Sequence, residues 1–223
     1  MTEQTVTITL PKRGATLAAL QKYGVYIAII VLLLYNLVLT PNFFQIENFR
    51  TQFVQVVPVL IVALGMALVI GTEGIDLSVG GVMALAAAVI PLYIGYGLVP
   101  VVIIAILVGS LVGFINGSLV AFVGVQPIVA TLSLMVAGRG IALLIANEQL
   151  KSVTDPNILA IGRGSVIGIP FSVIIAAVLV LAVTLLVNRT TVGKQLIAIG
   201  GSRRAAELSG LPVKRILLLV YII

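Results

Sequence analysis

The chain has 223 residues, of which 61% are hydrophobic and 9% charged, and its formal net charge is +6. Soluble domains carry about 25% charged residues, so this composition excludes an ordinary water-soluble globule and indicates a multi-span membrane protein. The sequence contains neither Cys nor His, which excludes disulfides and removes the commonest metal ligand and general base. We therefore expect the chain to be no enzyme, to bind no metal and to hold no cofactor of its own.

Several long hydrophobic runs follow one another along the chain. The complete runs have close to the length of about 20 residues that a helix needs to cross a bilayer. They are too long for strands and lack the alternation of strands, so we predict an all-α fold, a polytopic transmembrane helical bundle. Six complete spans and the start of a seventh are expected at residues 23–40, 54–71, 77–94, 98–123, 125–146, 166–187 and 216–223. Because the seventh run is cut short, we expect the membrane domain to be incomplete.

The basic residues indicate the topology. Nine of the thirteen Lys and Arg residues fall in residues 1–22 and 188–215. Six spans separate these two segments, so both lie on one side of the membrane, which the positive-inside rule makes the cytoplasm. We expect a plasma (inner) membrane protein with a cytoplasmic N-terminal segment at 1–22 and a membrane domain at 23–223. The rule explains the basic charge without nucleic acid as a partner.

Small residues recur every four positions in three of the predicted spans. Such stripes let helix backbones approach closely in lipid, and they favour a compact bundle. Asn116, beside the stripe of the fourth span, is expected to hydrogen-bond to a neighbouring helix. The stripes are Ala63, Ala67 and Gly71 in the second span, Gly80, Ala84 and Ala88 in the third, and Ala105, Gly109, Gly113, Gly117 and Ala121 in the fourth.

Glycines interrupt the pattern at residues 71–81, which read G-T-E-G-I-D-L-S-V-G-G. Two full spans take about 40 residues, and only 41 residues run from Val54 to Ile94, so we predict a broken helix here. Asp76 has the chemistry to cap the helix that follows. A polar group at membrane depth is also tolerated where it lines a water-filled path, and the two roles are compatible.

This stretch resembles the signature of the permease subunits of ABC importers for monosaccharides, the ribose, xylose and galactose type. Residues 74–80 match the family motif G-I-D-L-S-V-G in full, whereas Glu73 stands where Gly is commoner. Residues 125–140 are similar to a second family element and look closest to the galactofuranose-type permeases. Residues 190–210 are similar to the family's cytoplasmic loop, with Lys194 in place of Arg and Ser202 in place of Asn.

The resemblance implies a permease subunit that forms the translocation path of an ATP-driven monosaccharide importer. It implies as partners an ABC ATPase subunit, an extracytoplasmic sugar-binding protein and a second permease subunit, in a homo- or heterodimer surrounded by membrane lipid. ATP is expected on the partner, since the chain has no Walker-type phosphate loop. The path and signature residues that it indicates are Glu73, Gly74, Asp76, Ser78, Gly80, Asn116, Gln126, Thr131 and Arg139.

Arg139 places a charge inside the fifth predicted span. This costs at least about 2.5–3.5 kcal/mol on insertion scales, so the side chain is expected to face protein or water. Three roles stay open: pairing with Asp76 or Glu73, direct contact with a sugar, and reach to the outer interface.

Residues 188–215 form the longest polar stretch on the predicted cytoplasmic side. Ser202 can cap a short helix at 203–208, which Gly210 and Pro212 then end. A helix this short is only marginally stable in water, and we therefore expect docking to stabilise it. The resemblance implies that it docks on the ATPase. The expected coupling residues are Gly200, Gly201, Ser202, Arg203, Arg204, Ala205, Glu207, Leu208 and Gly210.

One alternative function stays open at this point. A secondary, proton-coupled sugar transporter, or half of one, would use Glu73 and Asp76 as its proton site.

Overall fold

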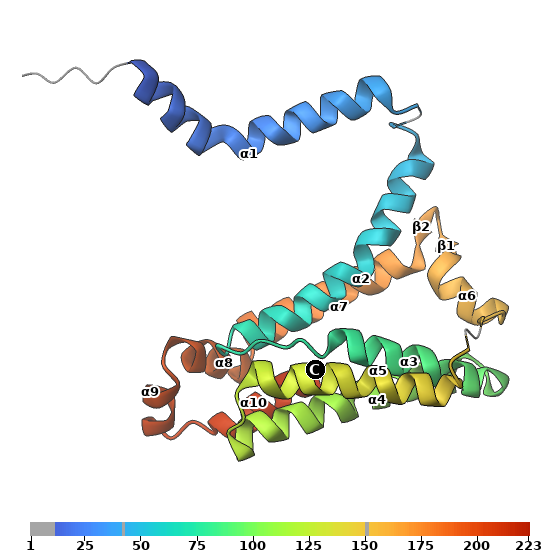
Figure 1. The fold of residues 1–223 in the computed structure, drawn as a ribbon, viewed down its shortest axis with the longest axis vertical. Coiled ribbons are helices and arrows are strands. Elements are labelled where there is room, and N and C mark those ends of the chain that lie inside the picture. Colours follow the sequence, from blue (N-terminus) through green and yellow to red (C-terminus); the bar gives the residue numbers. More distant parts are fainter. Residues whose placement is uncertain (1–11, 42, 150–151) are drawn as a thin grey trace, which may run out of the picture. The chain divides into compact units, whose positions relative to one another are not determined.

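A computed structural model describes residues 12–41, 43–149 and 152–223 (Figure 1). The chain divides into two compact units, residues 1–51 and 52–223. The first eleven residues of the predicted N-terminal segment lie outside the described residues. The elements are α1 (Lys12–Leu39), α2 (Ile46–Ile70), α3 (Val79–Tyr93), η1 (Ile94–Tyr96), α4 (Leu98–Ser118), η2 (Leu119–Val123), α5 (Pro127–Ala146), α6 (Pro156–Arg163), β1 (Ser165–Val166), β2 (Ile169–Pro170), α7 (Phe171–Arg189), α8 (Thr191–Gly201), α9 (Arg203–Leu208) and α10 (Val213–Ile222).

Six helices within the described residues are long and apolar enough to cross a membrane. They are Lys22–Leu39, Ile46–Ile70, Val79–Tyr96, Leu98–Val123, Pro127–Ala146 and Phe171–Arg189. This confirms the all-α polytopic fold and the predicted number of complete spans. The chain is a multi-pass membrane protein.

Several helix starts differ from the predicted span boundaries. α2 begins at Ile46, eight residues before the predicted start, because a helix can continue beyond the apolar stretch that the hydrocarbon requires. α5 begins at Pro127, where the fixed φ angle of proline suits the first helical position. The structure also adds α6, which Asp155 caps by accepting from the amides of Asn157 at 2.8 Å and Ile158 at 3.2 Å.

A small hairpin replaces the predicted start of the sixth span at residue 166. β1 pairs antiparallel with β2, and the turn between them consists of Ile167 and Gly168. Both turn residues have positive φ, 52° and 81°, as a type I′ hairpin turn requires. The run of apolar residues concealed this turn, because Ile is an unusual choice for a positive φ. The Ile167 side chain is 97% exposed.

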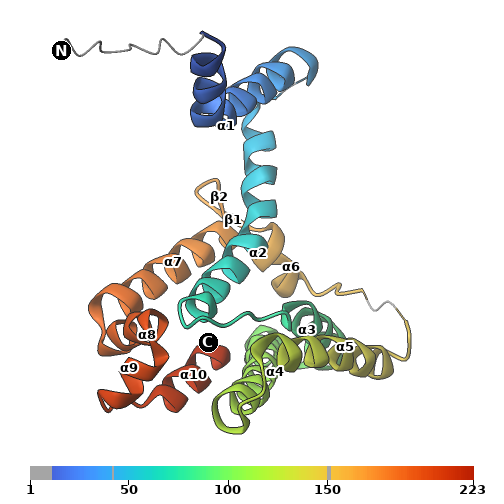
Figure 2. The ribbon, with the colours of Figure 1, turned by 60° about the vertical axis from the view of Figure 1, so that its left-hand side comes forward.

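In the second unit, α3 packs against α4 and α5 (Figures 1 and 2). A Cβ added to Gly81 of α3 would lie 2.9 Å from Cα of Met135 on α5, so the two backbones are nearly in contact. Gly138 faces Gly81 from the other helix, and a Cβ there would lie 3.3 Å from Cα of Gly81. Glycines on both helices therefore permit the close crossing of α3 and α5.

α4 carries its small residues against two neighbours, as predicted. A Cβ on Gly117 would lie 3.1 Å from Cα of Leu218 on α10, and one on Gly109 would lie 3.6 Å from the Val82 side chain of α3. The stripe in α2 is different, because Ala63 and Ala67 are exposed. The packing predicted for these two alanines is wrong for the described residues: α2 buries Leu68 and Val69 instead.

The largest hydrophobic core joins the C-terminal end of α2 to η2, to the start of α5 and to α8, α9 and α10. Its buried members are Leu68, Val69, Val120, Ala121, Ala130, Leu196, Ile199, Ala206, Val213, Ile216, Leu217, Val220 and Tyr221. This core brings residues of the predicted coupling segment into contact with residues beside the predicted helix break.

We predict that Gly113→Ala destabilises the protein by about 1–3 kcal/mol, the usual cost of forcing extra atoms into a packed core. The new Cβ would overlap the backbone carbonyl of Tyr221 on α10, which cannot move aside as a side chain can. The measurement is thermal unfolding of the detergent-solubilised protein. Gly140→Ala is the matched control, since a Cβ at that position of α5 meets nothing within 4 Å. An equal loss in both variants would contradict the close contact.

Candidate functional site: a broken helix and a basic helical segment

The break between α2 and α3 begins with a defined helix end. The amide of Gly74 donates to the Val69 carbonyl at 3.0 Å, and the amide of Glu73 donates to the Ile70 carbonyl at 2.9 Å. These two bonds form a Schellman motif, whose penultimate residue adopts a left-handed conformation. Glu73 occupies that position with a φ of 61°. Gly suits this conformation best, which explains why the motif usually has Gly where this chain has Glu73.

Asp76 organises the approach to α3. Its Oδ1 accepts from the Ser78 amide at 2.7 Å and from the Ser78 hydroxyl at 2.6 Å. A side chain that bonds the backbone two residues further on forms an Asx turn. The predicted bond to the amide of Ser78 is therefore confirmed, whereas the prediction that Asp76 caps α3 is wrong, because Ser78 stands at the N-cap of this helix.

Thr131 of α5 holds the extended part of the break. The side chain is fully buried, and its Oγ1 accepts from the Leu77 amide at 3.1 Å. Oγ1 also lies 2.9 Å from the Pro127 carbonyl of its own helix, to which it donates, and 3.4 Å from the Ile75 carbonyl. One hydroxyl thus attaches the break to a helix that lies more than fifty residues further along the chain.

Arg139 lies beside α3 rather than beside a carboxylate. Its Nη2 would be 3.0 Å from a Cβ on Gly80, so the glycine leaves room for the guanidinium group. Among the ion pairs of the described residues none involves Arg139, so of the three roles left open for it, pairing with Asp76 or Glu73 is not observed there. The exposed Arg139 lines a cleft of about 450 Å³ between α3 and α5, which also includes Glu148 and is otherwise mostly apolar.

Two further predicted path residues lie apart from the break. Asn116 of α4 is fully buried, and within the described residues neither of its side-chain polar atoms has a hydrogen-bond partner. The hydrogen bond predicted for it is therefore wrong there. Gln126 is exposed directly before α5 and makes no capping bond through its side chain.

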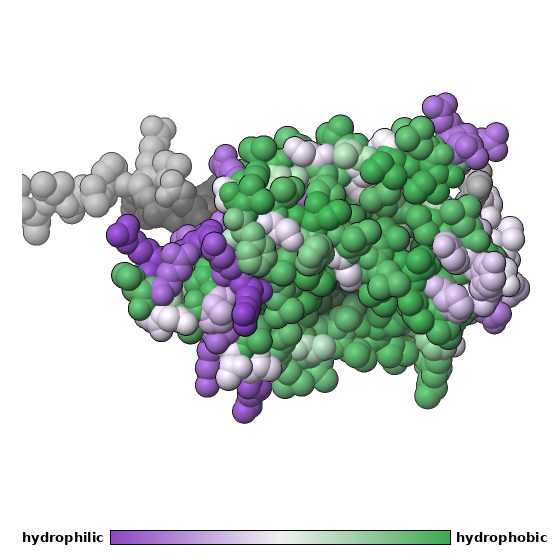
Figure 3. All heavy atoms as spheres, turned by 90° about the horizontal axis from the view of Figure 1, so that it is seen from below, coloured by the Kyte–Doolittle hydropathy of each residue, from purple (hydrophilic) through white to green (hydrophobic). Residues whose placement is uncertain are grey.

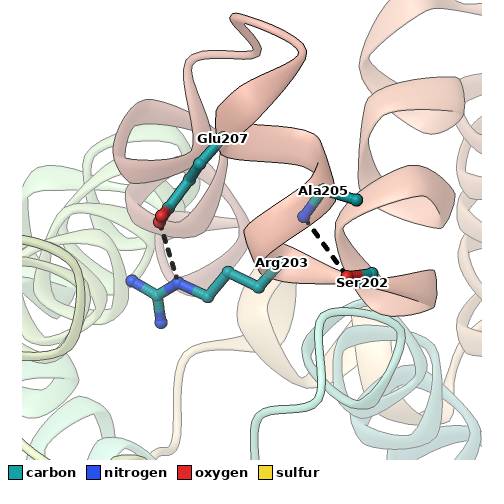
Figure 4. A network of polar contacts seen from close by, with 4 residues as sticks. All are labelled: Ser202, Arg203, Ala205 and Glu207. Carbon is teal, nitrogen blue, oxygen red and sulfur yellow. Dashed lines mark hydrogen bonds and ion pairs between the residues drawn. The ribbon is translucent and has the colours of Figure 1, made fainter.

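The predicted coupling loop consists mostly of helix, and α8 was not predicted. Thr190 caps α8 by accepting from the Gly193 amide at 3.2 Å. Ser202 caps α9 by accepting from the Ala205 amide at 3.2 Å, as predicted (Figure 4). α9 ends before Gly210, whose φ is 78°.

α9 presents charged groups and one apolar side chain to the exterior. Nε of Arg203 lies 3.4 Å from Oε1 of Glu207, one helical turn further on (Figure 4). Arg204 is exposed, and Leu208 at the end of the helix is 83% exposed. An exposed leucine beside arginines is suited to a partner surface with an apolar pocket and acidic groups.

A contact between glycines connects this segment to the break, and the sequence analysis missed it. A Cβ on Gly200 of α8 would overlap the backbone carbonyl of Gly71, the first residue after α2. A Cβ on Gly71 would lie 2.8 Å from the Leu196 side chain. The two glycines belong to separate motifs, and neither motif indicates the other as its neighbour.

Tyr221 of α10 was missed for a different reason. Its hydroxyl would lie 3.0 Å from a Cβ on Gly74, so the ring reaches the break from the last described helix. The hydroxyl is buried and has no hydrogen-bond partner within the described residues. The sequence offers no signal for it, because α10 is a short apolar run without a motif.

Comparison with known proteins gives one family and several relatives. The profile of the family described as "Branched-chain amino acid transport system / permease component" matches residues 48–223. The chain is 38% identical over 207 residues to the galactofuranose transporter permease protein YtfT of Escherichia coli strain K12, a match that covers 88% of the chain and 61% of YtfT. It is 42% identical over 170 residues to the fructose import permease protein FruF of Bifidobacterium longum, covering 74% of the chain and 48% of FruF.

A third relative aligns along almost the whole chain. The ribose import permease protein RbsC of Escherichia coli strain K12 is 34% identical over 227 residues, covering 99% of the chain and 70% of RbsC. The chain therefore spans 48% to 70% of the length of these curated relatives. No solved structure matches it significantly.

We predict that Thr131→Val destabilises the protein by about 0.5–1.5 kcal/mol, because it removes the hydrogen bond that the Leu77 amide donates to Oγ1 while keeping the side-chain volume. Thermal unfolding in detergent measures the loss. Thr131→Ser keeps the hydroxyl and should retain most of the stability. Ser133→Ala serves as a control, since the exposed Ser133 hydroxyl bonds only the Val129 carbonyl of its own helix. A Thr131→Val variant as stable as the parent would contradict the role of this hydroxyl.

Proposed function

The chain belongs to the permease-component family whose profile matches residues 48–223, and on that premise we propose that it forms the membrane path of an ATP-driven monosaccharide importer of the plasma (inner) membrane. The observation that carries this proposal is the similarity to permeases named for galactofuranose, fructose and ribose. The energy would come from a separate ATPase subunit. An extracytoplasmic binding protein would deliver the sugar, and a second permease subunit would complete the path.

The arrangement of the break divides the predicted path residues into two groups. Thr131, Ser78 and Asn116 are buried, so in this proposal they hold the helices in position. Glu73 and Arg139 are exposed and Asp76 is half-buried, so these side chains can reach a hydrated path. Hydroxyl groups of a sugar can accept from Arg139 and donate to the carboxylates.

The basic segment is the proposed contact with the ATPase. α9 exposes Arg203, Arg204 and Leu208, and the capping bond of Ser202 fixes where the helix begins. The proposed topology, with this segment and the N-terminus in the cytoplasm, rests on the positive-inside rule.

The contact between Gly200 and Gly71 offers a route for coupling. α8 and the C-terminal end of α2 belong to one packed core, and packed cores transmit displacement because they deform little. A displacement of α9 by the ATPase would therefore reach the break through α8. In this mechanism the opening and closing of the path follow ATP-driven movement of α8 and α9.

Charge reversal tests the docking surface. We predict that Arg203→Glu with Arg204→Glu abolishes co-purification of the ATPase from native membranes, because two attractive charges become repulsive. The matched control is Arg189→Glu with Lys194→Glu, which makes the same change of charge outside α9 and should retain the ATPase. Co-purification that survives the α9 exchange would contradict docking there, and the absence of any ATPase with the unaltered protein would contradict the proposed function.

A single methyl group tests the coupling route. We predict that Gly200→Ala reduces sugar uptake at least tenfold in vesicles while the ATPase stays bound, because the new Cβ overlaps the Gly71 carbonyl. Gly201→Ala is the control, since a Cβ there meets nothing within 4 Å. Uptake in the Gly200→Ala variant equal to that of Gly201→Ala would contradict the route.

A further inference from the structure

A groove of about 440 Å³ lies between η2 and the connection from α9 to α10. Phe122 of η2 lines it, together with Lys214 and Arg215 of α10. The remaining lining residues are Glu207, Leu211, Pro212 and Val213. The groove thus combines an aromatic ring with two cations.

The positive charge of this groove is not balanced within the described residues. Glu207 is its single acidic lining residue, and the Glu207 carboxylate already pairs with Arg203 at 3.4 Å. Lys214 and Arg215 are both exposed, and no ion pair of the described residues involves either. An anionic ligand would therefore meet two available cations.

The groove also lies where an apolar span meets a polar segment. Phe122 and Val123 are the last residues of the span Leu98–Val123, and their side chains are 53% and 70% exposed. Figure 3 shows such a transition on one face, where hydrophilic side chains gather at the margin of a broad hydrophobic surface. Aromatic side chains at span ends and adjacent cations are typical of the depth of lipid headgroups.

The local helix geometry produces this exposure. η2 is a π-helix, in which the Gly124 amide donates to the carbonyl of Leu119, five residues earlier. Single π turns inside α-helices are frequent at functional sites. The wider turn continues α4 to Val123 while Val120 and Ala121 enter the core and Phe122 faces the groove.

We propose that this groove binds an anionic phospholipid, with its phosphate on Lys214 and Arg215 and its acyl chain along Phe122 and Val123. The place of Phe122 and Val123 at the end of a membrane span favours a lipid over a soluble protein, since these side chains lie at the depth of the lipid headgroups. The groove adjoins α9, whose Glu207 lines it, but its two cations belong to α10 and not to the docking surface of Arg203, Arg204 and Leu208 proposed above.

The test uses the permease from its native membrane, exchanged into nanodiscs or detergent with defined lipids. Native mass spectrometry measures retention of phosphatidylglycerol and of phosphatidylcholine. Lys214→Ala with Arg215→Ala should weaken binding of phosphatidylglycerol about 30-fold, since each cation near an anionic headgroup contributes about fivefold in affinity. Binding of phosphatidylcholine should change less than about threefold. Phe122→Ala should weaken lipid retention but not competition by glycerol phosphate, which has no acyl chain.

Two controls separate a specific site from general surface charge. Arg189→Ala with Lys194→Ala removes the same charge from other positions and should leave lipid binding unchanged, and Lys214→Arg with Arg215→Lys should retain it. An equal loss of phosphatidylglycerol binding in the Arg189 and Lys194 variant would overturn the proposed site, because general attraction between surface charge and lipid would then explain the binding. Loss of the ATPase instead of the lipid from the Lys214 and Arg215 variant would assign the groove to protein docking. Neither result affects the proposed transport function, which the α9 variants test.

Discussion

The absence of water in the hydrocarbon core governs this structure. Every backbone amide and carbonyl at that depth needs a partner within the protein, and an interrupted helix has more such groups to satisfy than a continuous one. Here the end of α2 closes on itself through the amides of Glu73 and Gly74. Asp76 supplies an acceptor for Ser78, and Thr131 supplies one for Leu77. Three different devices thus provide acceptors for the amides of Glu73, Gly74, Leu77 and Ser78 within the break.

The break and the cytoplasmic segment are parts of one mechanical unit. Residues near the break share a hydrophobic core with α8, α9 and α10, and glycines remove the side chains that would separate Gly71 from Gly200. Glycine also governs the crossings of α3 with α5 and of α4 with α10. In lipid, where apolar side chains gain little by leaving their surroundings, such backbone proximity is the main source of helix association. The same contacts that stabilise the bundle therefore connect its moving parts.

Much of the fold could be predicted from the sequence, because the local composition of a segment determines whether it forms a membrane helix. The apolar runs predicted the spans, the spacing of Gly109, Gly113 and Gly117 predicted a packing face, and Ser202 predicted the start of α9. Other features depend on contacts between distant residues. Asp76 accepts from a neighbour two residues away, which sequence reasoning reached, whereas the bond from Leu77 to Thr131 crosses 54 residues. The role of Arg139 stayed open for this reason: opposite charges in a sequence do not specify which helix faces which. The hairpin at Ile167 was not predicted, because Ile is a residue that rarely adopts the positive φ of such a turn.

The π-helix at the end of α4 has a consequence for the comparison of this protein with its relatives. A π turn contains one residue more than the α-helical turn that it replaces. A relative with a regular helix at this point would have one residue fewer between Asn116 and Gln126, while the flanking helices kept their orientation. An alignment that places this one-residue gap outside the π turn would shift every residue between the gap and the turn by one position. It would then compare a core residue of one protein with a groove residue of the other. Gly124, which has a φ of 82°, marks where the two registers should meet again.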